Sequence, residues 1–407
     1  METKDNKLYL GGFSAEKLID EYGSPLYVYE EDKIRDNYKK LYSAIKWPKK
    51  KLLYACKANT NLAIMRILKE EGAGIDAVST GEIFLARKAG FNAEDILYTG
   101  NNMTDAEMDY AAEEGILLNI GSISRLEKFG KKYPNSDVCI RMNPNIKPDV
   151  HPHLATGHLD SKFGIPLVHR EEAKSIAEKY GLRIVGIHSH IGTTIMDIKV
   201  FQETLDVILD AALEFDGLDF IDFGGGIGIS YKPGQKEVDI EKLGEYIGKE
   251  FGEFCEAYGK ELEYRIEPGR YLVAQSGFLI SRINTIKDNG KKKFLGLDTN
   301  MAQLVRPSMY GAYHHIINAS NMDGKIEKVD VVGNICETGD FFAQDREVQE
   351  AKEGDVIAIK DTGAYGYSMS SNYNSFPRPA EILVSKGKNK IIREREAFED
   401  FLKGQTV

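Results

Sequence analysis

A lysine stands at the end of an apolar segment near the start of the chain. Residues 51–59 have the character of a strand, whose period of two places Leu53, Ala55 and Lys57 on one face. A lysine on a buried face is costly unless it is paired or used chemically. Burial also favours the neutral amine, which can form an imine with a carbonyl compound. Lys57 is therefore the first candidate catalytic residue, the alternative being an ammonium that extends into solvent.

Seven further strand-like segments follow and alternate with stretches of helical period. The strand-like segments cover residues 74–78, 96–100, 116–120, 138–143, 184–190, 220–226 and 264–269, and helical stretches include 64–69, 81–89, 105–114 and 171–180. Strands that alternate with helices imply parallel crossovers, and eight such units in roughly 250 residues predict a closed (β/α)₈ barrel.

The residues that end these segments are of types that do chemistry. They are Lys57, Asp76, Tyr98, Asn119, Arg141, His190, Gly224, Gly225, Gly226 and Glu267. Because active sites of such barrels lie at the C-terminal ends of the strands, we expect these side chains to form one site.

Two backbone motifs suit the binding of a phosphate group. Gly224, Gly225 and Gly226 follow an apolar strand, and consecutive glycines let backbone amides approach an anion. The run lacks the setting of a dinucleotide fingerprint. Pro268 and Gly269 end the eighth strand and can supply a second set of amides. Their place after strands seven and eight favours a phosphate site.

Glu267 and the histidine pair could act on an aromatic cofactor. A carboxylate at Glu267 could keep a ring nitrogen protonated, or it could form an ordinary ion pair with Arg265 or Arg270. The pair His188 and His190 could hold a metal, but the sequence shows no third ligand. We therefore expect one imidazole to stack on a cofactor ring, with Thr193 near the phosphate.

Composition sets the limits of the molecule. A chain of 407 residues exceeds one usual core, so two domains are expected, and a net charge of −10 argues against non-specific nucleic-acid binding. The start is charged and no long apolar run occurs, which predicts a cytoplasmic protein without a membrane anchor. Four cysteines and eight scattered histidines indicate neither a disulfide framework nor a metal site.

A second domain of mostly antiparallel β structure is predicted after about residue 280. Short β-rich runs cover residues 278–286, 328–332, 356–360, 380–384 and 390–393. The segment 7–29 has no place in the barrel and is expected to join this domain. The predicted boundaries are therefore 30–278 for the barrel, with 1–29 and 279–407 for the β domain.

A lysine, a glycine-rich phosphate site, a ring-nitrogen carboxylate and a stacking histidine together describe a site for pyridoxal 5′-phosphate. The chain resembles the alanine-racemase-fold (fold type III) decarboxylases that use this cofactor. The matching runs are Tyr54-Ala55-Cys56-Lys57-Ala58-Asn59, 75–82, 141–144, 156–164, 190–192, 224–226, 267–270, 306–310, 336–340 and 363–374. They span nearly the whole chain, with small departures at Thr193, Thr299, Asn300, Asn334 and Thr338.

The resemblance implies a role for each matching residue. Lys57 would form the imine, Glu267 would hold the pyridine nitrogen, and His190 would stack on the ring. The remaining cofactor-binding residues would be Asp76, Thr193, Gly224, Gly225, Gly226, Gly269, Arg270 and Tyr373, and the substrate-binding residues Arg270, Arg306, Tyr310, Glu337 and Tyr373. Cys336 would return a proton to the substrate, and the family implies that Cys336 and Glu337 reach in from the partner of a homodimer.

Two charges point to the substrate. A guanidinium at Arg306 suits a distal carboxylate, and Glu337 suits a distal ammonium, which together describe meso-2,6-diaminopimelate and predict its decarboxylation to L-lysine. A surface salt bridge is the alternative for Arg306. The open alternatives for the protein are a related decarboxylase acting on lysine, ornithine or carboxynorspermidine, and a non-catalytic cofactor-binding protein. A racemase is disfavoured, because it would be expected to have arginine in place of Glu267.

Overall fold

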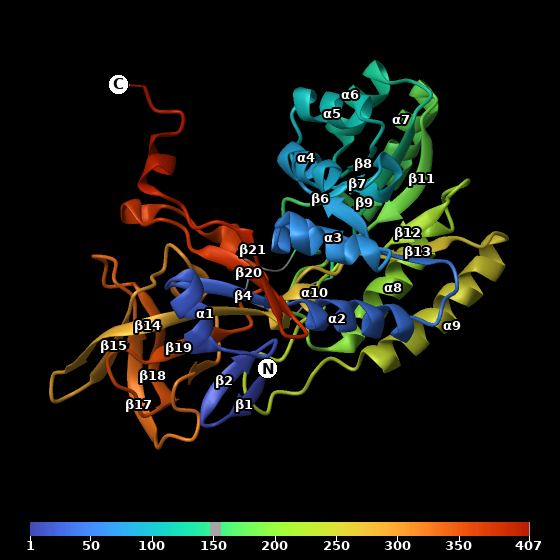
Figure 1. The fold of residues 1–407 in the computed structure, drawn as a ribbon. Helices are drawn as coiled ribbons and strands as arrows, with labels where there is room; N and C mark the ends of the chain where they lie inside the picture. Colours follow the sequence, from blue (N-terminus) through green and yellow to red (C-terminus); the bar gives the residue numbers. More distant parts are fainter. Residues whose placement is uncertain (147–155, 407) are drawn as a thin grey trace. The chain divides into compact units, whose positions relative to one another are not determined.

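The computed structural model describes residues 1–146 and 156–406. The chain divides into two compact units (Figure 1). One unit comprises residues 35–229 and 236–272 and contains the parallel strands. The other comprises residues 1–34, 230–235 and 273–407 and contains most of the antiparallel strands. We describe each unit separately.

The first unit is a closed barrel of eight parallel strands. The strands are β5 (Lys50–Ala55), β6 (Gly74–Ala77), β7 (Ile96–Tyr98), β8 (Leu117–Ile120), β9 (Asp137–Asn143), β11 (Arg183–His188), β12 (Phe220–Asp222) and β13 (Glu263–Ile266). Each pairs in parallel with the next, and the pairing of β13 with β5 completes the ring. A short strand β10 (Ile165–Pro166) adds to β9. The predicted (β/α)₈ fold is confirmed.

Helices α3 to α9 connect the barrel strands, α2 precedes the first strand and α10 follows the last (Figure 1). They are α2 (Glu31–Ala44), α3 (Leu62–Glu70), α4 (Thr80–Ala89), α5 (Asp105–Glu113), α6 (Ile123–Lys132), α7 (Arg170–Tyr180), α8 (Ile198–Ala212), α9 (Ile240–Tyr258) and α10 (Arg270–Val273). The caps explain where several begin and end. Ser79 accepts a hydrogen bond from the amide of Glu82 to start α4, and Gly90, in the left-handed region, ends it.

Apolar side chains fill one end of the barrel interior. Leu53, Leu97, Cys139, Val185 and Phe220 come from five different strands and form one buried cluster. The polar side chains of the same strands follow at their C-terminal ends. This division leaves the C-terminal end as the place where the barrel carries chemistry.

Several barrel strands end before the predicted position. The strand predicted to carry Lys57 ends at Ala55, and Lys57 lies in the short 3₁₀ turn η1 (Cys56–Ala58). The strands predicted to reach residues 190, 226 and 269 end at His188, Asp222 and Ile266. The glycine-rich loop shows the physical reason, because Gly224 and Gly226 have φ of 63° and 115°, far from the extended backbone of a regular strand.

The second unit is built on a sheet with the order β18-β17-β15-β14-β4-β20-β21. Its strands are β4 (Leu26–Glu30), β14 (Gly277–Asp288), β15 (Lys293–Leu297), β16 (Ile316–Asn318), β17 (Ile326–Val332), β18 (Phe341–Gln349), β19 (Val356–Lys360), β20 (Ala380–Ser385) and β21 (Lys388–Arg393). Strand β4 pairs with β14 and β20, so the N-terminal segment joins this sheet as predicted. The predicted runs missed β15, β16 and β18.

A second core lies within this unit. The three-stranded sheet β1 (Glu2–Lys4), β2 (Lys7–Leu10) and β3 (Phe13–Ser14) leads into helix α1 (Ala15–Tyr22). Leu10 and Leu18 from this region pack in one buried cluster with Val28, Ile280 and Ile382. The N-terminal residues are thus held by apolar burial as well as by the pairing of β4. None of the described helices has the length and apolar content that a transmembrane span requires.

Candidate active site

Lys57 and Asp76 form an ion pair at the C-terminal end of the barrel. The Nζ atom of Lys57 lies 2.5 Å from Oδ2 of Asp76, whose side chain is fully buried at the end of β6. Ala55 and Asp76 are register partners in β5 and β6, which brings the turn that carries Lys57 beside the carboxylate. The Lys57 side chain remains 33% exposed. The lysine therefore has the partner that a buried ammonium requires and is also accessible to a reactant.

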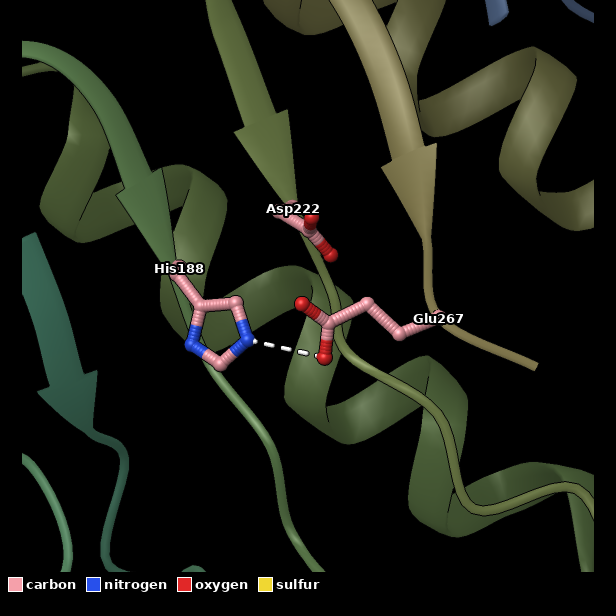
Figure 2. Close-up of side chains that lie close together, drawn as sticks. All are labelled: His188, Asp222 and Glu267. Carbon is pink, nitrogen blue, oxygen red and sulfur yellow. Dashed lines mark hydrogen bonds and ion pairs between the residues drawn. The ribbon is translucent and has the colours of Figure 1, made fainter. Parts of the chain in front are cut away.

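A second buried cluster comprises His188, Asp222 and Glu267. These side chains come from the ends of β11, β12 and β13 and point toward one another (Figure 2). Nε2 of His188 lies 3.1 Å from Oε2 of Glu267, and one ligand-type atom of each residue lies within 4.8 Å of the others. The sequence showed no third ligand beside the two histidines, whereas the structure brings two carboxylates to His188.

Burial shifts the pKa of all three groups toward the neutral forms. Burial, with the adjacent Glu267 carboxylate, raises the pKa of Asp222 to about 8. Burial and the negative charge of Asp76 raise the pKa of Glu267. Burial lowers the pKa of His188 to about 4. The neutral imidazole can therefore serve as a hydrogen-bond donor to a carboxylate without adding a positive charge.

His190 lies directly after this cluster and is half-buried. Its Nδ1 atom accepts a hydrogen bond of 3.1 Å from the amide of Gly225, which fixes the ring orientation. Burial, helped by the positive charges of Arg141 and Lys57, lowers the pKa of His190 well below its ordinary value. The ring is thus neutral and held by the glycine loop, as a stacking surface for an aromatic ring requires.

The glycine loop packs against backbone on all three of its glycines. An added Cβ would lie 2.5 Å from the carbonyl oxygen of Ser189 at Gly224, 2.2 Å from that of Glu267 at Gly225, and 2.5 Å from that of Gly192 at Gly226. The amide of Gly224 donates to Asp222, and that of Gly225 donates to His190. Two of the three amides that the sequence suggested for an anion therefore have partners within the chain. The two amides with partners are those of Gly224 and Gly225, and the amide of Gly226 is the third.

Gly269, Arg270 and Thr193 lie in the same unit as the glycine loop. Gly269 lies two residues after Glu267. A Cβ added at Gly269 would lie 3.1 Å from the carbonyl oxygen of Ala55. Both Nε and Nη2 of Arg270, which is buried, donate to the hydroxyl of Thr193 at 3.4 Å. The alternative of an ion pair between Glu267 and Arg265 is wrong, because Arg265 pairs with Glu263.

Arg141 is a buried residue of this end of the barrel, which the sequence analysis placed among the strand-end residues of the site without giving it a role. Its guanidinium lies 4.6 Å from the ring centroid of Phe163, and its Nη2 atom has no hydrogen-bond partner among the described residues. Burial lowers its pKa to about 10. A lone arginine inside a strand was the available signal, since arginine is rarely buried without a function or a partner.

In the β unit, Arg306 begins helix α11 (Arg306–Tyr310) and is buried. Its Nη1 atom donates to the hydroxyl of Tyr231 at 3.1 Å and lies 3.3 Å from Nε2 of His314. No carboxylate of the described part of the chain forms an ion pair with Arg306. The alternative of a surface salt bridge is therefore wrong, and no anion among residues 1–146 and 156–406 balances the charge of the guanidinium.

Cys336, Glu337 and Tyr373 form an exposed group in the β unit. The side-chain amide of Asn374 donates to Sγ of Cys336 at 3.2 Å. The pKa of Tyr373 is raised, mainly by its hydrogen bond with Glu337. The hydroxyl of Ser308 donates to the carbonyl of Gly339, which joins α11 and half-buried Tyr310 to the loop of Cys336.

The other three cysteines are buried. The structure thus separates one accessible thiol from three in the core. Burial of Cys56, Cys139 and Cys255 agrees with a packing role for these three thiols.

Comparisons with known proteins identify the fold and its chemistry. Residues 31–274 match the family model of the pyridoxal-dependent decarboxylases, described as their pyridoxal binding domain. The chain belongs to this family. It is 46% identical to the diaminopimelate decarboxylase of Methanothermobacter thermautotrophicus, over 98% of this chain and 96% of that protein. It is 40% identical to that of Aquifex aeolicus, with the same coverage.

A solved structure gives the same result. The diaminopimelate decarboxylase of M. jannaschii in complex with L-lysine superposes with a TM-score of 0.93 at 35% identity, covering 100% of this chain and 97% of that chain. Within the pyridoxal-dependent decarboxylases, the chain groups with the diaminopimelate decarboxylases. The resemblance that the sequence motifs indicated is confirmed.

The residues of the barrel end fit pyridoxal 5′-phosphate. Oε1 of Glu267 is buried and has no hydrogen-bond partner among the described residues, so it can accept from a protonated ring nitrogen. Lys57 supplies an accessible amine, and His190 supplies a neutral ring held in place by Gly225. The glycine loop leaves no space for a side chain at Gly224, Gly225 or Gly226, so only its backbone atoms can contact a ligand. The donor set thus matches an aldehyde, an aromatic nitrogen and a phosphate.

The raised carboxyl pKa predicts a pH dependence of stability in the cofactor-free protein. Between pH 6.5 and about 8, folded Asp222 keeps a proton that the unfolded chain, with the ordinary pKa of 3.8, has released. Its stabilisation is complete at low pH and is lost as the pH rises through 8. The pKa of His188 is about 4 in the folded protein and has the ordinary value of 6.5 in the unfolded chain. His188 therefore makes stability rise with pH, but only between these two values, below the window in which Asp222 acts.

The melting temperature of the cofactor-free protein should therefore fall from pH 6.5 to pH 8. Asp222→Asn should make that slope smaller, because asparagine does not titrate and only the raised pKa of Glu267 then contributes to it. Differential scanning calorimetry at closely spaced pH values measures the melting temperature of each protein and thus its slope with pH. Asp36→Asn, at an exposed position of α2, is the control and should keep the wild-type slope. Equal slopes in wild type and Asp222→Asn would contradict the assignment.

Proposed function

We propose that this protein removes one carboxylate from meso-2,6-diaminopimelate and releases L-lysine, using pyridoxal 5′-phosphate. The observation that supports the proposal most strongly is the barrel end, where an accessible lysine, a neutral histidine and an unsatisfied buried carboxylate meet. The matched family and the names of the full-length relatives support the reaction and the substrate.

The barrel residues would hold the cofactor in a defined way. Lys57 would bind it covalently, with Asp76 beside the amine, and His190 would cover one face of the ring. Gly226 and Gly269, with Gly224, Gly225, Thr193, Arg270 and Tyr373, would surround the phosphate. When bound, the cofactor accepts the electron pair that the departing carboxylate leaves behind. Glu267 would keep the ring nitrogen protonated and so strengthen this acceptance.

The remaining residues would select the substrate and return a proton. Arg306 would bind the distal carboxylate, Glu337 the distal ammonium, and Arg270, Tyr310 and Tyr373 would complete the substrate site. A buried guanidinium without a carboxylate partner among residues 1–146 and 156–406 supports the role of Arg306. The thiol of Cys336 would deliver a proton to Cα after the carboxylate has left.

We further propose that two copies of the chain share active sites. Cys336 and Glu337 are exposed, whereas groups that act on a substrate need a site that excludes water. A neighbouring copy would provide that cover and would receive these two residues in its own site. We also propose a cytoplasmic location and domain boundaries at 30–278 for the barrel, with 1–29 and 279–407 for the β domain.

A decarboxylase for lysine or ornithine is the nearest alternative. Those substrates have no distal carboxylate, so Arg306 would remain buried without an anion. A cofactor-binding protein without catalysis would not need Lys57, Glu267 and Cys336 together. Incubation with each amino acid and identification of the released product distinguishes these alternatives.

Lys57 should carry the cofactor covalently. Reduction of the holoprotein with borohydride should leave a pyridoxyl group on the peptide that contains Lys57, as peptide mass spectrometry would show. Lys57→Ala should lose the label and at least about a thousandfold in kcat, because the covalent step is removed. Lys51→Ala, which removes a lysine of the preceding strand β5 that pairs with Asp95, should keep the label. A label on another lysine would overturn the assignment.

Arg306 should determine substrate preference. Loss of one charge-assisted contact costs about 1.5–3 kcal/mol, so Arg306→Ala should lower kcat/KM for meso-diaminopimelate by about one to two powers of ten. Turnover of lysine should stay near its low starting value. Arg306→Lys keeps the charge but loses the bidentate geometry. Its kcat/KM for meso-diaminopimelate should lie between those of wild type and Arg306→Ala. Equal losses for both substrates would mean that Arg306 is structural.

Shared sites predict that two inactive variants can restore activity together. Lys57→Ala and Cys336→Ala chains, dissociated and reassociated in equal amounts, should recover about a quarter of wild-type activity, because half of the dimers contain one native site. Each variant treated alone is the control. Exchange shown by native mass spectrometry without recovered activity would exclude the shared site.

A further inference from the structure

His188 is buried beside Glu267, although the roles considered so far leave it without a function. The side chain is 0% exposed at the end of β11, in register with Asp222 of the neighbouring strand β12. Its Nε2 atom lies 3.1 Å from Oε2 of Glu267, whereas its Nδ1 atom has no hydrogen-bond partner in the described part of the chain. The polar contact of His188 is therefore directed at Glu267 (Figure 2).

The two oxygens of Glu267 have different surroundings. Oε2 faces His188, and Oε1 is buried and unpartnered among the described residues. The backbone of Glu267 is fixed separately, because its amide donates to the carbonyl of Gly224 at 2.7 Å. The long side chain retains several rotatable bonds, so a second contact at Oε2 is needed to fix the direction of the carboxylate.

From these contacts, we propose that His188 is a positioning residue for the cofactor. It donates its Nε2–H to Oε2 of Glu267, which fixes that carboxylate and leaves Oε1 to receive the hydrogen of the cofactor's ring nitrogen. This inference rests on the proposed function, in which Glu267 holds that nitrogen.

A neutral donor suits this position better than a cation does. A lysine or arginine at position 188 would form an ion pair with Glu267 and compete with the protonated ring nitrogen for the carboxylate. Neutral imidazole orients the carboxylate and leaves its negative charge available. The burial that lowers the pKa of His188 to about 4 supports the neutral form at working pH.

Asp222 completes the local arrangement without replacing His188. Its Oδ1 atom accepts a hydrogen bond of 2.9 Å from the amide of Gly224, and its Oδ2 atom has no partner among the described residues. With its pKa raised to about 8, Asp222 keeps its proton at neutral pH. Burial raises the pKa of Glu267 as well, so the negative charge of Glu267 forms when a protonated ring nitrogen is bound beside it.

Two substitutions separate a hydrogen-bonding role from space filling. His188→Gln can place an N–H near the position of Nε2, whereas His188→Met fills a similar volume without a donor. Each is made in wild type and in a Glu267→Ala background, and the dissociation constant for pyridoxal 5′-phosphate is measured by fluorescence titration of the cofactor-free protein. The absorption spectrum of the bound cofactor is followed as a function of pH. Circular dichroism verifies that each variant folds.

His188→Met should weaken cofactor binding about tenfold in wild type and less than twofold in the Glu267→Ala background, and His188→Gln should restore most of the affinity. The spectral pH midpoint should shift in His188→Met and return toward wild type in His188→Gln. Equal losses in both backgrounds, or a Gln variant that behaves like the Met variant, would overturn the inference. If Glu267→Ala itself leaves cofactor affinity and spectrum unchanged, the proposed role of Glu267 fails instead.

A second measurement does not depend on the cofactor or on mutant folding. Nitrogen-15 NMR of the cofactor-free wild-type protein, labelled at histidine, reports which ring nitrogen of His188 carries the proton. The proposal requires the Nε2–H tautomer at about pH 9, where the Glu267 carboxyl is ionised despite its raised pKa. Observation of the Nδ1–H tautomer, or of a doubly protonated ring, would contradict it.

Discussion

Closure of the parallel sheet is the constraint on which the barrel site depends. The pairing of β13 with β5 brings the last strand of the barrel beside the first, although they are separated by about two hundred residues of sequence. Parallel strands that close in one ring end on the same side, so Lys57, Asp76, His188 and Glu267 meet without any local relation among them. Their chemistry follows from this meeting, because each group alone would be a costly buried charge.

The ionisable groups of the site are arranged in pairs. Asp76 accompanies Lys57, and His188 accompanies Glu267, so each reactive group has one partner that a ligand can replace or share. Unsatisfied atoms at Asp76, Glu267 and Arg141 remain in the described structure. Buried polar atoms without partners cost stability, and their concentration at one end of an otherwise apolar barrel is characteristic of a binding site rather than of a core.

The β unit contributes groups of a different kind. Arg306 is buried and held by Tyr231, whereas Cys336, Glu337 and Tyr373 are exposed on neighbouring loops. A buried cation provides selectivity because its position is fixed and an unsuitable ligand leaves it unbalanced. Exposed loop residues can instead enter a site of another copy, which agrees with the proposed dimer. In the proposed function, substrate selection thus belongs to the buried Arg306, and proton transfer belongs to Cys336 on an exposed loop.

The sequence by itself determined the barrel, the second β domain, the attachment of the N-terminal strand and the family. Those features follow from local patterns: the alternation of strand and helix, the glycine run, and the motif around Lys57. Boundaries were less accurate where glycine and proline end a strand early, as at Asp222 and Ile266. Backbone conformation there depends on positive φ values and close packing, which residue types indicate only in part.

Only the tertiary structure decided which groups touch. The contact of His188 with Glu267, the engagement of the Gly224 and Gly225 amides, and the burial of Arg306 against Tyr231 join residues from separate elements. Hydrogen bonding and pKa depend on distances of a few ångströms and on the exclusion of water. A linear sequence contains neither quantity, so it could name the candidate residues but could not assign their partners.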